Sequence, residues 1–415
     1  MTQIMYKNNI ILLLFTSLAI SQNGLKNGEA EQNKISFNLP SGVDIDVAGE
    51  VEFEFVDVEG EGGAINSNEF IQKVQTRSPH VRIDKAVLKF NILYSDNISF
   101  RFGLRFNDDN AYVDKSYLLI KKNNTKYEIG SNRPAIALKR EIEGYPLIGT
   151  AFWKGRQYHI DIQQKFSNIT FGGSFALKRP LGYDSPAEDK SYRILVYDNM
   201  PNKTRDWDGV TIESGLRASF HLNPLKITGW YYTGKLYDDY DWQSVLMNDF
   251  SDYRVAQGTV LPKDANRDHY WFGGRAEIST ALGIFRGEYI YSLDGYLPRS
   301  GYYVEFGTPF KLMEFPLYCL ARYGELNINP ESNMYIGQDW TAELDDPETW
   351  DRSLITFATV YELTTYSKIK FEYYITGETT GDSQDLADSY NNNTGRDYQP
   401  DMDDNQLLIQ FELNF

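Results

Sequence analysis

The feature that most constrains this chain is a two-residue alternation of apolar and polar side chains that recurs along most of its length. It is clearest in residues 407–415, where every second residue from Leu407 to Phe415 is apolar and the residues between are mostly polar. Successive side chains of a β-strand point to opposite faces, so the pattern predicts a strand with one apolar face. At the edge of a soluble sheet such a face would invite aggregation.

The same alternation predicts strands through the rest of the chain. It covers residues 43–55, 98–107, 169–178 and 368–376, where aliphatic and aromatic residues alternate with charged, small or polar ones. A soluble sandwich buries its apolar faces together, so one strand of this kind is ambiguous. More than a dozen such strands of about ten residues, with charges on the opposite face, fit an apolar exterior around a wet lumen.

The links between these strands alternate between short and long. Short links are predicted at 95–97, 123–125, 167–168, 222–224, 280–283, 311–315 and 364–367. Longer links are predicted at 59–79, 107–112, 131–150, 180–208, 238–268, 293–299, 325–351 and 379–404.

This alternation of links defines the predicted fold. It is all-β, a transmembrane antiparallel up-and-down β-barrel of about 16 strands with short periplasmic turns and long extracellular loops. Residues 192–197 could form a further strand, but they would make the strand number odd, so we place them in a loop.

The N-terminus indicates export. Lys7 precedes an apolar run at residues 10–20, and the small residues Ala19 and Ser21 follow at the spacing of a cleavage site. The run is shorter than the ~20 apolar residues of a membrane helix. We therefore expect a signal peptide at 1–21, a periplasmic N-terminal segment at 22–41 and the transmembrane barrel at 42–415.

Composition narrows the partners. The net charge of −17 argues against nucleic acid, and the single Cys319 forms no internal disulfide. The acidic residues are concentrated in links 238–268, 325–351 and 379–404. We predict no metal site and no cofactor beyond divalent cations held loosely at these acidic loops, because no EF-hand pattern is present.

Inward-facing basic residues are the candidate functional groups. Glu213, Glu277 and Glu372 share the predicted inner face with them, and rings of basic side chains favour anions in pores. The pore-lining and constriction candidates are Arg101, Arg105, Arg133, Lys139, Arg140, Lys178, Arg217, Arg275, Lys368 and Lys370.

The link that begins at Asn132 is more apolar than a water-bathed loop should be. It carries Arg133, Lys139 and Arg140 against Glu141 and Glu143. We predict that it folds into the lumen and narrows it. Lying on the outer surface is the competing arrangement.

Four segments together resemble the phosphate-selective porin O and P family. They are Arg82–Phe90, Phe100–Phe106, Asp114–Leu118 and Gly130–Pro134. The resemblance implies a sixteen-stranded, trimeric anion pore lined with basic residues.

The sequence departs from that family at Asp84 and Val87, where the family has arginines, and Pro134 lacks the phenylalanine that follows it in the family. We therefore expect a porin in the outer membrane of a Gram-negative bacterium, with a water-filled channel for passive diffusion of small hydrophilic solutes, including anions such as phosphate. The alternative is a structural or adhesive barrel with acidic surface loops and no transport role.

We expect no enzymatic activity. The histidines His80, His159, His221 and His269 stand in no recognisable catalytic context. The expected partners are outer-membrane lipid and lipopolysaccharide, the barrel assembly machinery through the terminal Phe415, and two further copies of the chain in a homotrimer.

Overall fold

The fold is seen in a computed structural model. The structure describes residues 35–39, 42–58, 79–106, 111–177, 212–235, 268–294, 297–312, 315–328, 351–379, 401–402 and 405–415. The wall of the barrel is formed by β2 (Asp44–Val58), β3 (His80–Ser95), β4 (Ile98–Phe106), β5 (Ala111–Lys122), β6 (Thr125–Asn132), β7 (Gln157–Phe166), β8 (Ile169–Leu177), β9 (Ile212–Leu222), β10 (Leu225–Lys235), β11 (Asp268–Thr280), β12 (Gly283–Asp294), β13 (Leu297–Leu312), β14 (Phe315–Ile328), β15 (Asp351–Thr364), β16 (Ser367–Thr379) and β18 (Gln406–Asn414).

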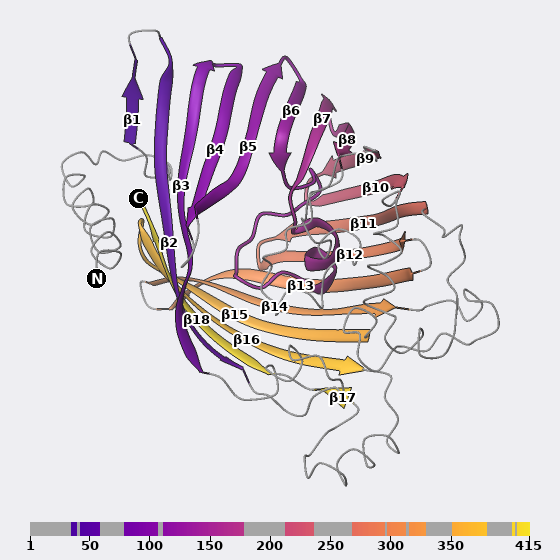
Figure 1. Cartoon of the computed structure of the whole chain (residues 1–415). Helices are drawn as coiled ribbons and strands as arrows, with labels where there is room; N and C mark the ends of the chain where they lie inside the picture. Colours follow the sequence, from indigo (N-terminus) through magenta and orange to yellow (C-terminus); the bar gives the residue numbers. More distant parts are fainter. Residues whose placement is uncertain are drawn as a thin grey trace, which may run out of the picture.

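These strands close into one ring (Figure 1). Each strand from β2 to β16 pairs antiparallel with the next in the chain, β16 pairs with β18, and β18 pairs with β2. Two short strands are appended: β1 (Ile35–Asn38) pairs with the start of β2, and β17 (Asp401–Met402) pairs with the end of β16. The predicted antiparallel barrel of sixteen strands is confirmed.

All seven predicted short turns lie between the expected strands. At two of them, Asn123 and Ser167 adopt φ angles of +53° and +47°, the left-handed region that tight hairpins require. The seven turns lie at one end of the barrel, because each follows an odd-numbered strand from β3 to β15.

The opposite end differs from expectation in two links. The links predicted at 107–112 and 293–299 are short, because β4 ends at Phe106 and β5 begins at Ala111, while Asp294 of β12 pairs directly with Leu297 of β13. The strands β14 and β15 also extend into the link predicted at 325–351, ending at Ile328 and beginning at Asp351. The predicted signal peptide, residues 192–197 and most of the acidic links lie outside the described residues.

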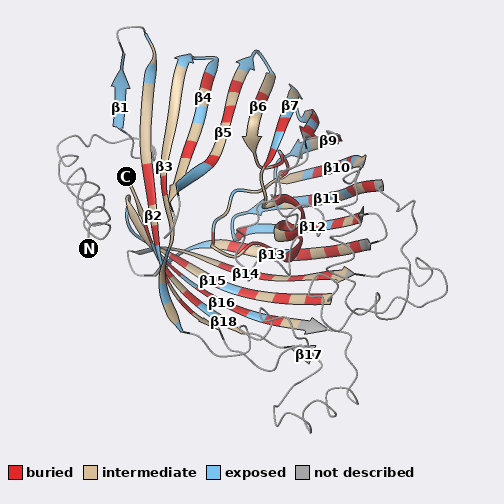
Figure 2. Cartoon of the chain, viewed as in Figure 1, coloured by how far each residue is buried: buried red, intermediate tan, exposed pale blue. Residues whose placement is uncertain are grey.

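The outer face of the barrel is apolar and the inner face is polar. Figure 2 shows the resulting alternation of exposed and buried residues along the strands. Large apolar side chains such as Leu216 and Phe175 are 72% and 57% exposed, whereas charged Glu54 and Arg275 are 1% and 5% exposed. This inversion of the soluble pattern suits a lipid exterior, in which a closed barrel satisfies every backbone hydrogen bond.

Among the described residues, no helix is long and apolar enough to cross a bilayer.

The seam of the ring is completed by the last residue. Gly49 and Phe415 exchange backbone hydrogen bonds of 2.7 and 3.0 Å, one register step beyond the Glu50–Asn414 pair of β2 and β18. A Cβ atom at Gly49 would overlap the Phe415 ring. Gly49 therefore leaves the space that the terminal aromatic ring occupies.

Replacing Gly49 with valine should destabilise the folded barrel by about 1–3 kcal/mol, because the added side chain overpacks against Phe415. The measurement is the temperature at which the folded band converts to the unfolded band in detergent gel electrophoresis. Gly229→Ala is the matched control, since the nearest atom to a Cβ there is 3.9 Å away. Equal transition temperatures for both variants would contradict the role of the Gly49–Phe415 contact.

Candidate functional site

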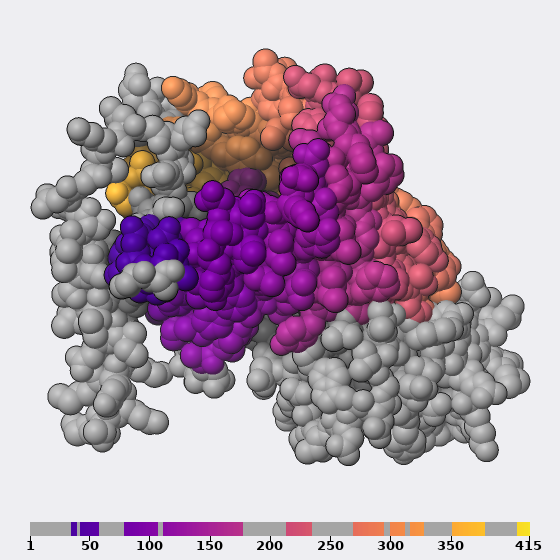
Figure 3. All heavy atoms as spheres, turned by 90° about the horizontal axis from the view of Figure 1, so that it is seen from above, coloured from indigo at the N-terminus to yellow at the C-terminus, as the bar shows by residue number. Residues whose placement is uncertain are grey.

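The link between β6 and β7, residues 133–156, lies inside the barrel. Its side chains Ile136, Ile142, Ile148, Phe152 and Trp153 are almost completely buried. Figure 3 shows the barrel hollowed between its purple and orange strands, with a purple segment deep in the hollow. The expectation that this loop folds inward is confirmed, and its single helical turn is η2 (Gly149–Trp153).

Aromatic packing fixes the loop to one side of the lumen. The ring of Phe152 stacks on Trp271 of β11 with 5.9 Å between ring centres, and Trp271 stacks on Tyr232 of β10 with 4.4 Å between ring centres. The Trp153 indole N–H donates a hydrogen bond of 2.9 Å to Glu288 of β12. Each such aromatic pair contributes about 0.5–1.5 kcal/mol beyond its buried area, so this half of the lumen is a packed core.

Polar contacts extend the attachment around the ring. The Arg275 guanidinium of β11 donates to the Ile136 carbonyl at 2.9 Å. Arg140 in the loop lies 3.5 Å from Glu52 of β2, and Gln410 of β18 donates to Glu143 at 3.1 Å. The loop therefore contacts the wall from β11 through β18 to β2.

The wall formed by β3 to β5 remains lined by charged side chains that reach solvent. Arg101 of β4 is exposed, and Lys89 of β3 and Arg105 of β4 have side chains that are 38% and 28% exposed. The loop reaches this wall near its own end, where Arg156 forms a 2.5 Å salt bridge with Asp114 of β5. This wall thus keeps basic side chains that are accessible to solvent.

The candidate basic residues divide into two groups. Six form salt bridges within the barrel: Arg105 with Asp84, Arg140 with Glu143 and Glu52, Arg217 with Asp161, Arg275 with Glu288, and Lys368 and Lys370 with Glu412. Within the described part of the chain, Arg101, Arg133 and Lys139 form no salt bridge.

Arg101 and Arg133 have aromatic partners instead. Arg101 donates to the Tyr117 hydroxyl at 3.3 Å, and the Arg133 guanidinium lies 5.2 Å from the Tyr145 ring centre. Lys139 is exposed, and Lys178 lies outside the described residues. A pore-lining role for the candidate residues stays a prediction.

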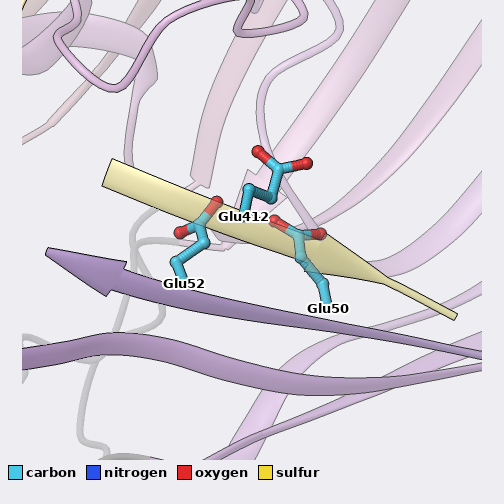
Figure 4. A group of neighbouring side chains, drawn as sticks. All are labelled: Glu50, Glu52 and Glu412. Carbon is cyan, nitrogen blue, oxygen red and sulfur yellow. The ribbon is translucent and has the colours of Figure 1, made fainter. Parts of the chain in front are cut away.

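Three carboxylates gather where β2 meets β18. Figure 4 shows Glu50 and Glu52 on β2 and Glu412 on β18. Each has an ammonium partner: Lys85 contacts Glu50 and lies 3.1 Å from Glu52, and Lys370 lies 2.8 Å from Glu412. Lys85 and Lys370 therefore compensate negative charge of this group.

The lumen wall also carries a row of paired charges, most of which the sequence analysis did not predict. It runs across neighbouring strands from Lys226 through Glu277, Arg286 and Glu305 to Arg322, with contacts of 2.5 to 3.1 Å. Of these residues the sequence analysis singled out only Glu277. A signal for the inward Arg286 was present in the sequence. In residues 285–291, the charged Arg286 and Glu288 alternate with aromatic residues and a glycine, which indicates that the charged pair faces the lumen.

The comparisons with known proteins concern the fold. No protein-family model matches the sequence, and no curated protein matches it. The outer membrane channel DcaP of Acinetobacter baumannii matches with a TM-score of 0.56 and 11% identity over 91% of this chain and 99% of that one. The anion-selective porin of Comamonas acidovorans matches with a TM-score of 0.53 and 10% identity over 90% and 100%.

A third structure is the trimer form of OmpT, an outer membrane protein of Vibrio cholerae. It matches with a TM-score of 0.51 and 12% identity, covering 90% of this chain and 99% of that one. At such low identity the likeness shows the fold, which is that of the outer-membrane porins. Together with the apolar outer face, this fold places the chain in the outer membrane of a Gram-negative bacterium.

Burial should decide which lumen salt bridges stabilise the barrel. Arg217 donates two hydrogen bonds of 2.5 and 2.7 Å to Asp161, and both side chains are buried. Asp161→Asn leaves a buried guanidinium without its counter-ion and should cost about 3 kcal/mol. The measurement is urea unfolding in lipid vesicles, followed by tryptophan fluorescence.

The control for this prediction is Lys226→Met. Lys226 pairs with Glu277 at 2.7 Å, but its side chain is 42% exposed, so the loss should be about 0–1 kcal/mol. An Asp161→Asn loss no greater than that of the control would contradict the prediction.

Proposed function

We propose that the chain is a porin that forms a water-filled channel for passive diffusion of small hydrophilic solutes. The observation that carries the proposal is the division of the lumen. Loop 133–156 and the wall from β11 to β2 form a close-packed half, and the wall of β3 to β5 keeps exposed charged side chains. A sixteen-stranded barrel is wide enough to hold both a packed loop and an aqueous passage.

Charge along the passage supports a preference for anions such as phosphate. The carboxylates Glu50, Glu52 and Glu412 are each in contact with lysines. In contrast, Arg101, Lys115 and the loop residue Arg133 form no salt bridge with any described residue. Unpaired basic side chains in a pore attract anions and repel cations.

The environment of the histidines supports a protein without catalytic activity. His159 and His269 are buried and each is bonded to a carboxylate, Glu128 at 3.2 Å and Glu213 at 2.7 Å. A hydrolytic site would instead need an accessible nucleophile beside the histidine. Both histidines therefore fit a structural role in the wall.

The assembly state and surface partners belong to the same proposal. The solved OmpT structure named as a trimer supports a homotrimer for this chain. The apolar outer face supports contact with membrane lipid and lipopolysaccharide. The terminal strand, with Phe415 at the seam, supports recognition by the barrel assembly machinery.

Purified protein in a planar lipid bilayer should produce discrete conductance steps without any energy source. Under a salt gradient, the sign of the reversal potential should report anion preference, because the open wall carries the unpaired bases. A folded protein that gives no steps would favour the structural or adhesive barrel, and a cation-selective potential would overturn the anion preference.

The double variant Arg101→Gln, Lys115→Gln should weaken the anion preference. A unit charge about 10 Å from the permeating ion contributes about 0.4 kcal/mol in water, a factor of about two for each residue. The measurement is the anion-to-cation permeability ratio. Lys226→Gln is the control, since Lys226 is already paired with Glu277, and an equal shift for control and double variant would contradict the assignment.

A further inference from the structure

One glycine of the inward loop has both its backbone N–H and its backbone C=O bonded to side chains of opposite charge on the wall. The Gly144 N–H donates to Glu372 Oε2 of β16 at 3.0 Å, and the neighbouring Glu143 N–H donates to Glu372 Oε1 at 2.5 Å. The Gly144 carbonyl accepts a hydrogen bond of 2.9 Å from Arg322 of β14. The Tyr374 hydroxyl also donates to Glu372. We call Gly144, Arg322, Glu372 and Tyr374 the loop latch.

The carboxylate of the latch depends on the loop for its partners. Glu372 is 1% exposed, and among the described residues it forms no salt bridge. Two of its three hydrogen-bond donors are loop backbone groups. A buried carboxylate without donors is costly, and backbone N–H groups stabilise it strongly. The side chain is therefore accommodated at this position only when the loop is docked.

Arg322 is also bonded to a residue of the wall itself. Its guanidinium forms a salt bridge with Glu305 of β13, with contacts of 2.6 and 2.7 Å, and Glu305 is paired in turn with Arg286 of β12. The wall thus presents a hydrogen-bond donor at β14 and an acceptor at β16. The N–H and C=O groups of the single residue Gly144 bond to this acceptor and this donor.

The latch also requires glycine in the loop. A Cβ atom at Gly144 would stand 2.5 Å from Cε1, 2.6 Å from the hydroxyl oxygen and 2.9 Å from Cζ of Tyr374. Tyr374 is buried and bonded to Glu372, so its ring cannot move aside without losing that bond. Any side chain at position 144 would push the loop away from the wall.

We propose that Glu372 and Gly144 are positioning residues that hold the loop in the lumen and thereby set the width of the channel. The proposal rests on the proposed channel function. It separates two parts of the loop: the aromatic segment at η2 is buried in the packed half, and the tip around Gly144 is held in place by the latch. Loss of the latch should free the tip around Gly144 to move out of the lumen, so that the channel widens.

The test compares open-channel conductance of the parent protein, Glu372→Ala and Gly144→Val in planar bilayers. Either variant should raise the open-channel conductance by up to about twofold, because the freed tip would no longer occupy part of a barrel that is wide enough for an aqueous channel. The double variant should have the same conductance as each single variant. Both changes break the same contact, so their effects are not additive.

Glu277→Ala is the matched control. Glu277 is also a lumen carboxylate, but its partners are the wall residues Lys226 and Arg286, and no described loop residue contacts it. The control should keep the parent conductance. Heat modifiability on detergent gels confirms a folded barrel for each variant, and if one latch variant does not fold, the other decides.

The outcomes separate the two proposals. A folded parent protein without conductance steps would overturn the channel function. A conducting parent whose folded Glu372→Ala variant keeps the parent conductance would overturn the latch and leave the channel function standing. A rise in the Glu277→Ala control as large as that of the latch variants would also overturn the latch.

Discussion

The structure depends above all on backbone hydrogen bonding in a medium that offers none. A strand in lipid must satisfy its N–H and C=O groups with neighbouring strands, and only a closed sheet does so without an open edge. The pairing of β18 with β2 provides this closure. Once the ring is closed, the two-residue period assigns one face to lipid and the other to the lumen, so the exterior and interior chemistry follow from a single geometric rule.

The lumen then faces the opposite problem, because it concentrates charged side chains in a confined space. The chain resolves it by pairing charges across adjacent strands, as in the series from Lys226 to Arg322, and by bonding loop backbone to wall charges at Arg275 and Glu372. The side of the lumen that receives the loop is neutralised and packed. The wall along β3 to β5, which the loop contacts through Arg156, retains Arg101 and Lys115 without salt bridges to the described residues.

The strands, their order and the seven turns could be predicted from sequence, because alternation and turn residues are local signals. The inward course of loop 133–156 was also predictable from its unusual apolar content. The charge partners were not, because they depend on the register between strands, which a period of two does not determine. Glu372 illustrates this: its inward direction followed from Ile369 to Thr376, but its bonds to Gly144 join residues more than two hundred positions apart. The short link between β12 and β13 was missed although the dipeptide Asp294-Gly295 is a turn signal, because the predicted link was extended to residues 293–299 over positions that belong to the strands.

The packed half of the lumen has a mechanical consequence. Phe152, Trp153, Trp271 and Tyr303 belong to one cluster of buried side chains, and packed protein interiors are hardly compressible. One side of the passage is therefore a rigid surface, and thermal motion changes its diameter little. A bore bounded in this way would discriminate between molecules by a sharp size threshold, with a steep fall in permeation over a small increase in molecular radius.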